Sequence, residues 1–206
     1  MSNHGAEQRS ERDGSLGRAL ARLVLSWAGW SVDPFPDVPR AVVTGGPHTS
    51  NWDAVVGVLA GTALGLRPVF LIKKKAFRGP LGPLLRRFGG VPIDRSRHTG
   101  AVEQAVERFA GTEPLVMVVT PEGTRTNAPR WKTGFYHIAR EAGVPIVVAT
   151  ADYARRRLEL PLVLEPSGDL DADMQRIIDC FARVTPRHPE KLSAPVKTAR
   201  ERLQGK

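Results

Sequence analysis

The strongest constraint on the fold is an alternation of short apolar runs with helix-length segments between residues 40 and 183. β-rich runs at 40–44, 68–72, 91–93, 115–120, 144–151 and 158–164 are interleaved with helical patterns at 51–66, 79–88, 99–110, 133–142 and 170–183. Strands that alternate with helices form a mostly parallel sheet with helices on both faces. Because the chain has 206 residues, one such core is expected. The sequence therefore predicts a single α/β domain.

The first 39 residues differ from this pattern and divide into three parts. Residues 1–14 are polar, and we expect them to be disordered. Residues 15–39 contain an amphipathic helix, with Leu16, Leu20, Leu23 and Trp27 at helical spacing, and a proline-rich connector. This helix either packs on the domain or lies in a bilayer interface with its tryptophans at headgroup depth, and these interpretations are compatible. The main domain is expected to span 40–206.

Positive charge is concentrated in one stretch of a chain whose net charge is +9. Residues 67–97 contain nine Lys or Arg side chains and only one acid, Asp94. Such a field attracts phosphate on nucleic acid, on an anionic bilayer or on a small substrate. The chain has few aromatic residues for base stacking and lacks helix-turn-helix or zinc-finger spacing, so we predict no nucleic-acid partner.

Cysteine content and hydropathy exclude other classes of protein. Cys180 is the single cysteine, which rules out an internal disulfide or a cysteine-based metal cluster and fits a reducing compartment. The longest uncharged run, Ala54–Leu66, has 13 residues, whereas a membrane-spanning helix needs ~20. Residues 1–14 mix acids with bases and precede no cleavage site, so we expect no signal peptide. We also expect no metal site.

The first chemically suggestive motif is Pro47-His-Thr-Ser-Asn-Trp-Asp53, which follows a predicted strand and enters a predicted helix. A loop of this length can bring His48 onto the Asp53 carboxylate. The carboxylate would hold one ring nitrogen as N–H and leave the other free to take a proton from an alcohol. The same residues are also typical of a capped helix, since Ser50 can cap and Asp53 favours a first helical turn.

Two further motifs follow strands of the predicted sheet, and ligands collect at the carboxyl ends of such strands. Gly89 and Gly90 permit close backbone approach, and Arg95 at the end of that stretch could bind phosphate. Glu122 and Arg125 come directly after the strand at 115–119. Both motifs can also be ordinary tight turns with no functional role. In the glycine-rich segment, Asp94 and Arg97 would then form a surface pair.

Taken in order, these motifs resemble those of a known family. His48-xxxx-Asp53, the glycine-rich segment ending in Ile-Asp-Arg95, Pro-Glu-Gly-Thr-Arg125 and Val144-Pro-Ile are similar to motifs of the glycerolipid acyltransferases, of which the lysophosphatidic acid acyltransferases are best known. The resemblance covers about half of the chain. It implies transfer of a fatty acyl group from acyl-CoA or acyl carrier protein to a hydroxyl of a lysophospholipid-like acceptor, with 1-acylglycerol-3-phosphate as the expected acceptor. It also implies no cofactor and no acyl-enzyme.

The resemblance assigns roles to individual residues. His48 would be the general base and Asp53 its orienting partner. The substrate-binding residues would be Lys73, Arg95, Glu122, Gly123, Thr124, Arg125 and Lys132. Lys132 forms with Gly134 the Lys-x-Gly pair that usually follows the third motif. The resemblance and the basic stretch together predict a cytoplasmic enzyme associated peripherally with the inner, anionic face of the cell membrane.

Two departures from the family pattern leave the acceptor open. Thr120 replaces the usual Phe before Pro-Glu-Gly-Thr-Arg, and Lys75-Ala76 stands where Glu-Leu is frequent. Both changes lie near the acceptor side, so a different polar lipid alcohol remains an alternative acceptor. A further alternative is a thioesterase-like hydrolase, in which His48 would activate water instead of an alcohol.

Overall fold

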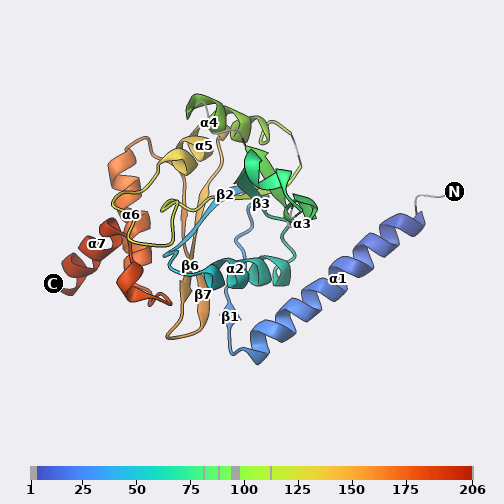
Figure 1. Cartoon of the computed structure of the whole chain (residues 1–206), viewed down its shortest axis with the longest axis horizontal. Helices are drawn as coiled ribbons and strands as arrows, with labels where there is room; N and C mark the ends of the chain where they lie inside the picture. The colour runs from blue at the N-terminus through green and yellow to red at the C-terminus, as the bar shows by residue number, and fades with distance from the viewer. Residues whose placement is uncertain (1–3, 81, 88, 94–97, 112, 206) are drawn as a thin grey trace.

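A seven-stranded sheet with helices on both faces forms the centre of the molecule (Figure 1). The structure is a computed structural model that describes residues 4–80, 82–87, 89–93, 98–111 and 113–205. The strands are β1 (Ser31–Val32), β2 (Arg40–Gly46), β3 (Val69–Lys73), β4 (Gly90–Ile93), β5 (Leu115–Val118), β6 (Ile146–Asp152) and β7 (Arg157–Leu164). They are arranged in the order β1-β7-β6-β2-β5-β3-β4. This confirms the predicted α/β fold with a mostly parallel sheet.

The antiparallel exception in the sheet is the pair β6 and β7. Parallel neighbours need a crossover of a dozen or more residues, whereas residues 153–156 form only a short turn between these two strands. β1 then pairs with β7 in parallel at the edge of the sheet. The turn at 153–156 begins at the edge of the sheet where β2 ends, so it lies near the loop that follows β2.

Most of the helices correspond to helical patterns that the sequence predicted. They are α1 (His4–Trp27), α2 (Asn51–Ala63), α3 (Gly82–Arg87), α4 (His98–Glu107), α5 (Gly134–Ala142), α6 (Leu170–Ala182) and α7 (Ala194–Gln204), with short 3₁₀ helices η1 (Lys74–Arg78) and η2 (Pro189–Lys191). The patterns at 51–66, 99–110, 133–142 and 170–183 thus correspond to α2, α4, α5 and α6. We did not expect β1, η1, η2 or α7, because each is short or only weakly periodic in sequence.

Alternating side chains of the strands divide the core into two layers. Val42, Met117 and Ile146 pack with α5, α6 and α7 in the larger cluster. Ala41, Val43 and Val116 belong to a second cluster on the opposite face, which includes residues of the connector before β2. The period of two along β2 therefore sends neighbouring residues to different layers.

Helix α1 packs against the outer side of α2 and extends away from the domain (Figure 1). It begins at His4, within the segment that we expected to be disordered, and ends at Trp27, before the proline-rich connector. Ala21 and Leu25 are buried against α2, whereas Leu16, Leu23 and other apolar side chains of α1 are exposed. In the described part of the chain, no helix has the length and hydropathy to cross a membrane.

Candidate active site

The motif at residues 47–53 forms the entry to α2. Ser50 is the N-cap residue, and its hydroxyl accepts a hydrogen bond from the backbone N–H of Trp52 at 3.1 Å. The carboxylate of Asp53 accepts from the backbone N–H groups of Thr49 and Ser50 through Oδ2, at 2.7 Å each. The expected capping of this helix is therefore observed, and Asp53 is part of it.

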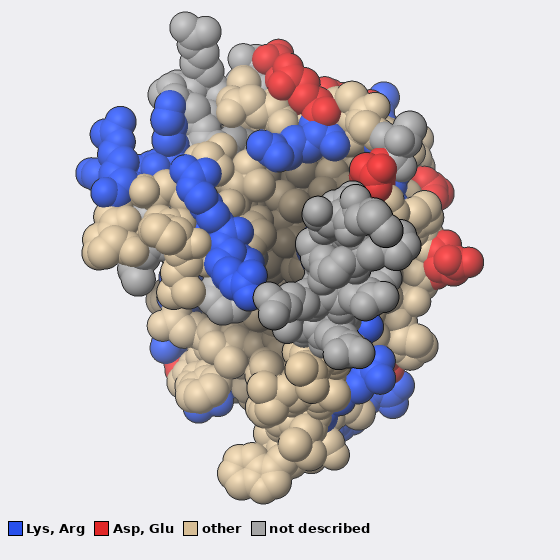
Figure 2. Space-filling model, turned by 90° about the vertical axis from the view of Figure 1, so that its right-hand side faces the viewer, with Lys and Arg blue, Asp and Glu red and all other residues tan. Residues whose placement is uncertain are grey.

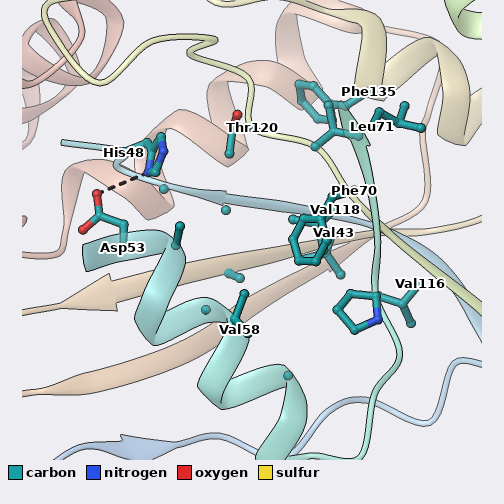
Figure 3. A pocket seen from close by; sticks show the side chains of 18 of the residues that line it. Val43, His48, Asp53, Val58, Phe70, Leu71, Val116, Val118, Thr120 and Phe135 are labelled. Atoms are coloured by element: carbon teal, nitrogen blue, oxygen red, sulfur yellow. Dashed lines mark ion pairs between the residues drawn. The ribbon is translucent and has the colours of Figure 1, made fainter. Parts of the chain in front are cut away.

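The same Asp53 oxygen also faces His48. Nδ1 of His48 lies 3.3 Å from Oδ2 of Asp53, and the two side chains are only 18% and 8% exposed (Figure 3). Oδ1 of Asp53 accepts a hydrogen bond from the hydroxyl of Tyr153 at 2.7 Å. The capped helix and the His–Asp pair, which the sequence left as alternatives, therefore coexist on one carboxylate.

Asp53 is held in its charged form. Burial by itself raises its pKa, but hydrogen bonds from His48, Tyr153 and the backbone of Ser50 and Thr49 outweigh burial and lower the pKa below its ordinary value. A charged Asp53 can orient His48 with Nδ1 as the donor. Nε2 is then the nitrogen available to accept a proton.

Glu122 joins this site through the backbone of His48. Its carboxylate, which is 4% exposed, accepts a hydrogen bond from the His48 backbone N–H through Oε2. A second bond links it to the hydroxyl of Ser193, which also accepts from the indole of Trp131 at 3.0 Å. Burial raises the pKa of Glu122, and these bonds only partly oppose the effect. The structure thus gives Glu122 a clear structural partner, the loop that carries His48.

An apolar cavity of about 1280 Å³ begins at His48 and Asp53. One part of it lies between α2 and the sheet, with Val58 of the helix facing Val43 and Val118 of the strands (Figure 3), and its lining also includes Phe135 and Ile138 of α5. The volume exceeds the ~300–1,000 Å³ of ordinary small-molecule pockets. Such a space suits a long, flexible hydrocarbon group whose reactive end lies beside His48.

Basic side chains lie near the cavity. Figure 2 presents the side of the molecule on which α3 lies in Figure 1, and Lys and Arg side chains line part of the rim of a hollow there. Lys74, Lys75, Arg86 and Arg87 are exposed on η1 and α3. The walls of the cavity are therefore apolar, while its surroundings favour a negatively charged headgroup or membrane.

The remaining predicted residues differ in how closely they approach the dyad. Gly123 and Lys132 line the same cavity as His48. Gly123 has a φ of +65°, and a β-carbon there would lie 3.1 Å from the Lys132 side chain, so glycine permits both the turn and the close approach. Thr124 and Arg125 follow in the same turn and are exposed.

Two predicted phosphate ligands lie, in whole or in part, outside the described residues. Arg95 lies outside the described residues, as do Asp94 and Arg97. Lys73 is the last residue of β3, and its side chain also lies outside the described part.

Gly89, of the predicted glycine-rich segment, has a φ of +77°, and a β-carbon there would meet the carbonyl oxygen of Pro68 at 2.1 Å. This glycine thus allows close packing against the chain's own backbone.

Comparison with known proteins identifies the family. A family model described as "Acyltransferase" matches residues 33–151, more than half of the chain. This chain belongs to the acyltransferase family. The predicted family and enzyme class are thereby confirmed. Among curated proteins, none matches the sequence of this chain significantly.

A solved structure has a similar fold. The crystal structure of the 1-acyl-sn-glycerophosphate (LPA) acyltransferase PlsC from Thermotoga maritima aligns with a TM-score of 0.56 and 16% identity, covering 100% of this chain and 81% of that one. At this identity the match concerns the fold alone. It agrees with the single α/β domain and its N-terminal helix.

Three residues from the C-terminal part of the acyltransferase contact the site around His48 and Asp53, and the sequence did not predict them. Tyr153 contacts Asp53 across 100 positions, Ser193 contacts Glu122, and the backbone N–H of His188 donates to the hydroxyl of Thr49 at 3.3 Å. No local pattern marks these residues, because their partners lie far away in the sequence.

Among the described residues, no cluster of three His, Cys, Asp or Glu side chains could hold a metal ion.

Proposed function

We propose that this acyltransferase uses His48 as a general base and Asp53 as its orienting partner to acylate the hydroxyl of a lysophospholipid-like acceptor. The observation that carries the proposal is the placement of the His48–Asp53 pair, 3.3 Å apart, at one end of the apolar cavity. A base in this position can serve an acceptor hydroxyl while the cavity holds the acyl chain. 1-Acylglycerol-3-phosphate is the acceptor that we favour.

The acyl donor in this proposal is a thioester of coenzyme A or acyl carrier protein. Its hydrocarbon chain would occupy the space between α2 and the sheet, where Val43, Val58 and Val118 provide apolar walls. Burial of a methylene group contributes about 0.8 kcal/mol, so a long chain can supply substantial binding energy. The thioester carbonyl would then lie beside His48.

The acceptor would be held by its phosphate. Lys132 lines the cavity and is exposed next to Gly123, and Arg125 is exposed in the same turn, so both can reach a headgroup. Lys73 and Arg95 complete the proposed set of cations. The acceptor named for the Thermotoga maritima PlsC, 1-acyl-sn-glycerophosphate, carries such a phosphate.

The proposed reaction is a direct transfer. Nε2 of His48 takes the proton of the acceptor hydroxyl as its oxygen attacks the thioester carbonyl. The resulting tetrahedral intermediate collapses with cleavage of the carbon–sulfur bond, and the proton on His48 passes to the departing thiolate. Because His48 acts only as a base, donor and acceptor must be bound together and no acyl-enzyme forms. General-base catalysis contributes roughly 10²–10⁴-fold.

Peripheral attachment to an anionic membrane is also part of the proposal. Helix α1 buries one side against α2 and exposes an apolar stripe on the other, formed by Leu16, Leu20, Leu23, Val24 and Trp27. Such a stripe can enter a bilayer interface while the basic residues of η1 and α3 meet lipid phosphates. Membrane contact would bring a membrane-bound amphiphilic acceptor to the cavity.

The test is an acyl-transfer assay with radiolabelled acyl-CoA and acyl carrier protein thioesters, using lysolipids with and without a terminal phosphate. We expect phosphate-dependent transfer, a loss of roughly 10²–10⁴-fold in kcat for His48→Ala, and a selective loss with phosphorylated acceptors for Arg125→Ala and Arg95→Ala. Full activity of His48→Ala or a trapped acyl-enzyme would refute the base mechanism. Thioester consumption that does not depend on lysolipid would instead indicate a hydrolase.

A further inference from the structure

We infer that Tyr153 is a positioning residue of the catalytic dyad, which fixes the Asp53 carboxylate so that it presents one particular oxygen to His48. The inference rests on the proposed role of His48 and Asp53. Tyr153 lies in the turn between β6 and β7, outside the residues that the acyltransferase family model matches. Its role therefore comes from the geometry of this chain.

The two oxygens of Asp53 have different partners. Oδ2 faces Nδ1 of His48 and accepts from two backbone N–H groups of the motif loop. Oδ1 accepts from the Tyr153 hydroxyl at 2.7 Å. The hydrogen bonds to Oδ2 alone would leave the carboxylate free to pivot about that oxygen. The bond to Oδ1 opposes this rotation, so the position of the imidazole depends on Tyr153.

Tyr153 is itself held on three sides. Its backbone N–H donates to the carbonyl oxygen of Thr185 at 2.8 Å, and its ring packs edge-on against Trp30 with centroids 5.1 Å apart. The guanidinium of Arg187 lies 5.8 Å from the Tyr153 ring centroid and 5.3 Å from that of Trp52. A ring restrained in this way loses little conformational entropy when its hydroxyl binds Asp53.

Burial and the neighbouring Asp53 carboxylate keep the Tyr153 hydroxyl protonated. Burial and the negative charge of Asp53 raise its pKa well above the ordinary tyrosine value, and Arg187 opposes this only in part. The other titratable groups of the cluster are His48 and Glu122, which both interact with Asp53. Tyr153 therefore remains a hydrogen-bond donor at neutral pH.

The test is Tyr153→Phe, which keeps the ring and its packing against Trp30 but removes the donor to Asp53. We expect kcat to fall roughly 10- to 100-fold, the factor for losing one hydrogen bond to a charged group, while KM for both substrates changes little. Loss of this donor leaves more negative charge on the Asp53 carboxylate, so the His48–Asp53 pair as a unit holds a proton more strongly. The acid limb of the kcat profile should therefore move to higher pH, which a purely structural defect does not produce.

Tyr136→Phe is the matched control, because Tyr136 is the other tyrosine of the chain and also donates to a carboxylate, that of Asp173, at 3.0 Å. We expect it to lower the melting temperature without moving the pH profile. An unchanged kcat and pH profile in folded Tyr153→Phe would overturn the inference, as would an equal pH shift in Tyr136→Phe. If instead wild type and His48→Ala transfer acyl groups equally well, the proposed dyad itself fails.

Discussion

The side chain of Glu122 contacts His48 through the backbone N–H of that residue, across 74 positions of the chain. The bond connects the turn after β5 to the loop that precedes α2. The carboxylate of Glu122 is thereby held against the backbone of the residue that carries the imidazole. Two motifs that are separate in the sequence therefore form one structural unit.

We predict that Glu122→Ala is more damaging than Glu122→Gln. The alanine variant leaves the His48 N–H and the Ser193 hydroxyl without their partner, at a cost of about 1–3 kcal/mol, and releases the motif loop. Glutamine keeps an acceptor oxygen and removes a buried charge, so its unfolding free energy should remain near that of wild type. Urea unfolding and acyl-transfer rates check both variants. Equal losses for alanine and glutamine would show that the charge, not the bond, matters.

The cavity predicts a change in acyl-chain preference. Val58 faces the cavity from α2, so Val58→Trp should shorten the space for hydrocarbon and lower kcat/KM for palmitoyl donors roughly 10-fold relative to octanoyl donors. Val55→Trp is the control on the same helix, because Val55 is 44% exposed. Competition between donors of different length measures the ratio. A parallel loss for long and short donors would place the acyl chain elsewhere.

The exposed stripe of α1 predicts how the enzyme binds vesicles. Replacing both Leu20 and Leu23 with Glu should weaken binding to phosphatidylglycerol-rich vesicles at least about 10-fold, because two apolar side chains can no longer enter the interface. Ser26→Glu adds a charge at another exposed position of the helix and serves as control. Co-sedimentation measures binding. Equal binding of wild type to neutral and anionic vesicles would contradict the electrostatic contribution.

We predict that Asp173 makes the free energy of unfolding depend on pH, independently of catalysis. Burial raises its pKa, but hydrogen bonds from Ser167 and Tyr136 outweigh burial and hold the pKa below its ordinary value. Its contribution is therefore present above pH about 3.9, the value in an unfolded chain, and is lost as the pH falls through the lower folded pKa. Asp173→Asn should cost about 1–3 kcal/mol at pH 7 and progressively less in acid.

Chemical unfolding of wild type and Asp173→Asn from pH 7 to pH 3 tests this prediction, with acyl transfer at pH 7 as the control readout. A stability difference that stays constant over this range would show that the ionisation of Asp173 is not involved. A loss of kcat in the folded variant would show that Asp173 also influences the active site.

Most of the fold could be predicted because its elements are encoded locally. The apolar runs that predicted the sheet correspond to β2 to β7, and the pattern at 51–66 corresponds to α2. β1 has only two residues, and its pairing with β7 joins Ser31 to Arg157. Such a strand has no periodicity of its own. Its existence depends on a neighbour that is distant in sequence.

The sequence by itself determined the entry to α2, because Ser50 caps the helix and Asp53 completes the capping box within four consecutive residues. It also determined which motifs lie at the ends of strands, since the strand and helix patterns order the chain. These features depend on contacts between near neighbours. For that reason, His48 and Asp53 could be proposed as a pair from spacing alone.

Only the tertiary structure decided how that pair is completed. Tyr153 reaches Asp53 from the turn after β6, and Glu122 reaches the backbone of His48 from the turn after β5. The sheet order, which places both β5 and β6 beside β2, brings these turns to one edge. Hydrogen bonds act over about 3 Å, whatever the separation in sequence, so partners 74 and 100 positions apart leave no local pattern.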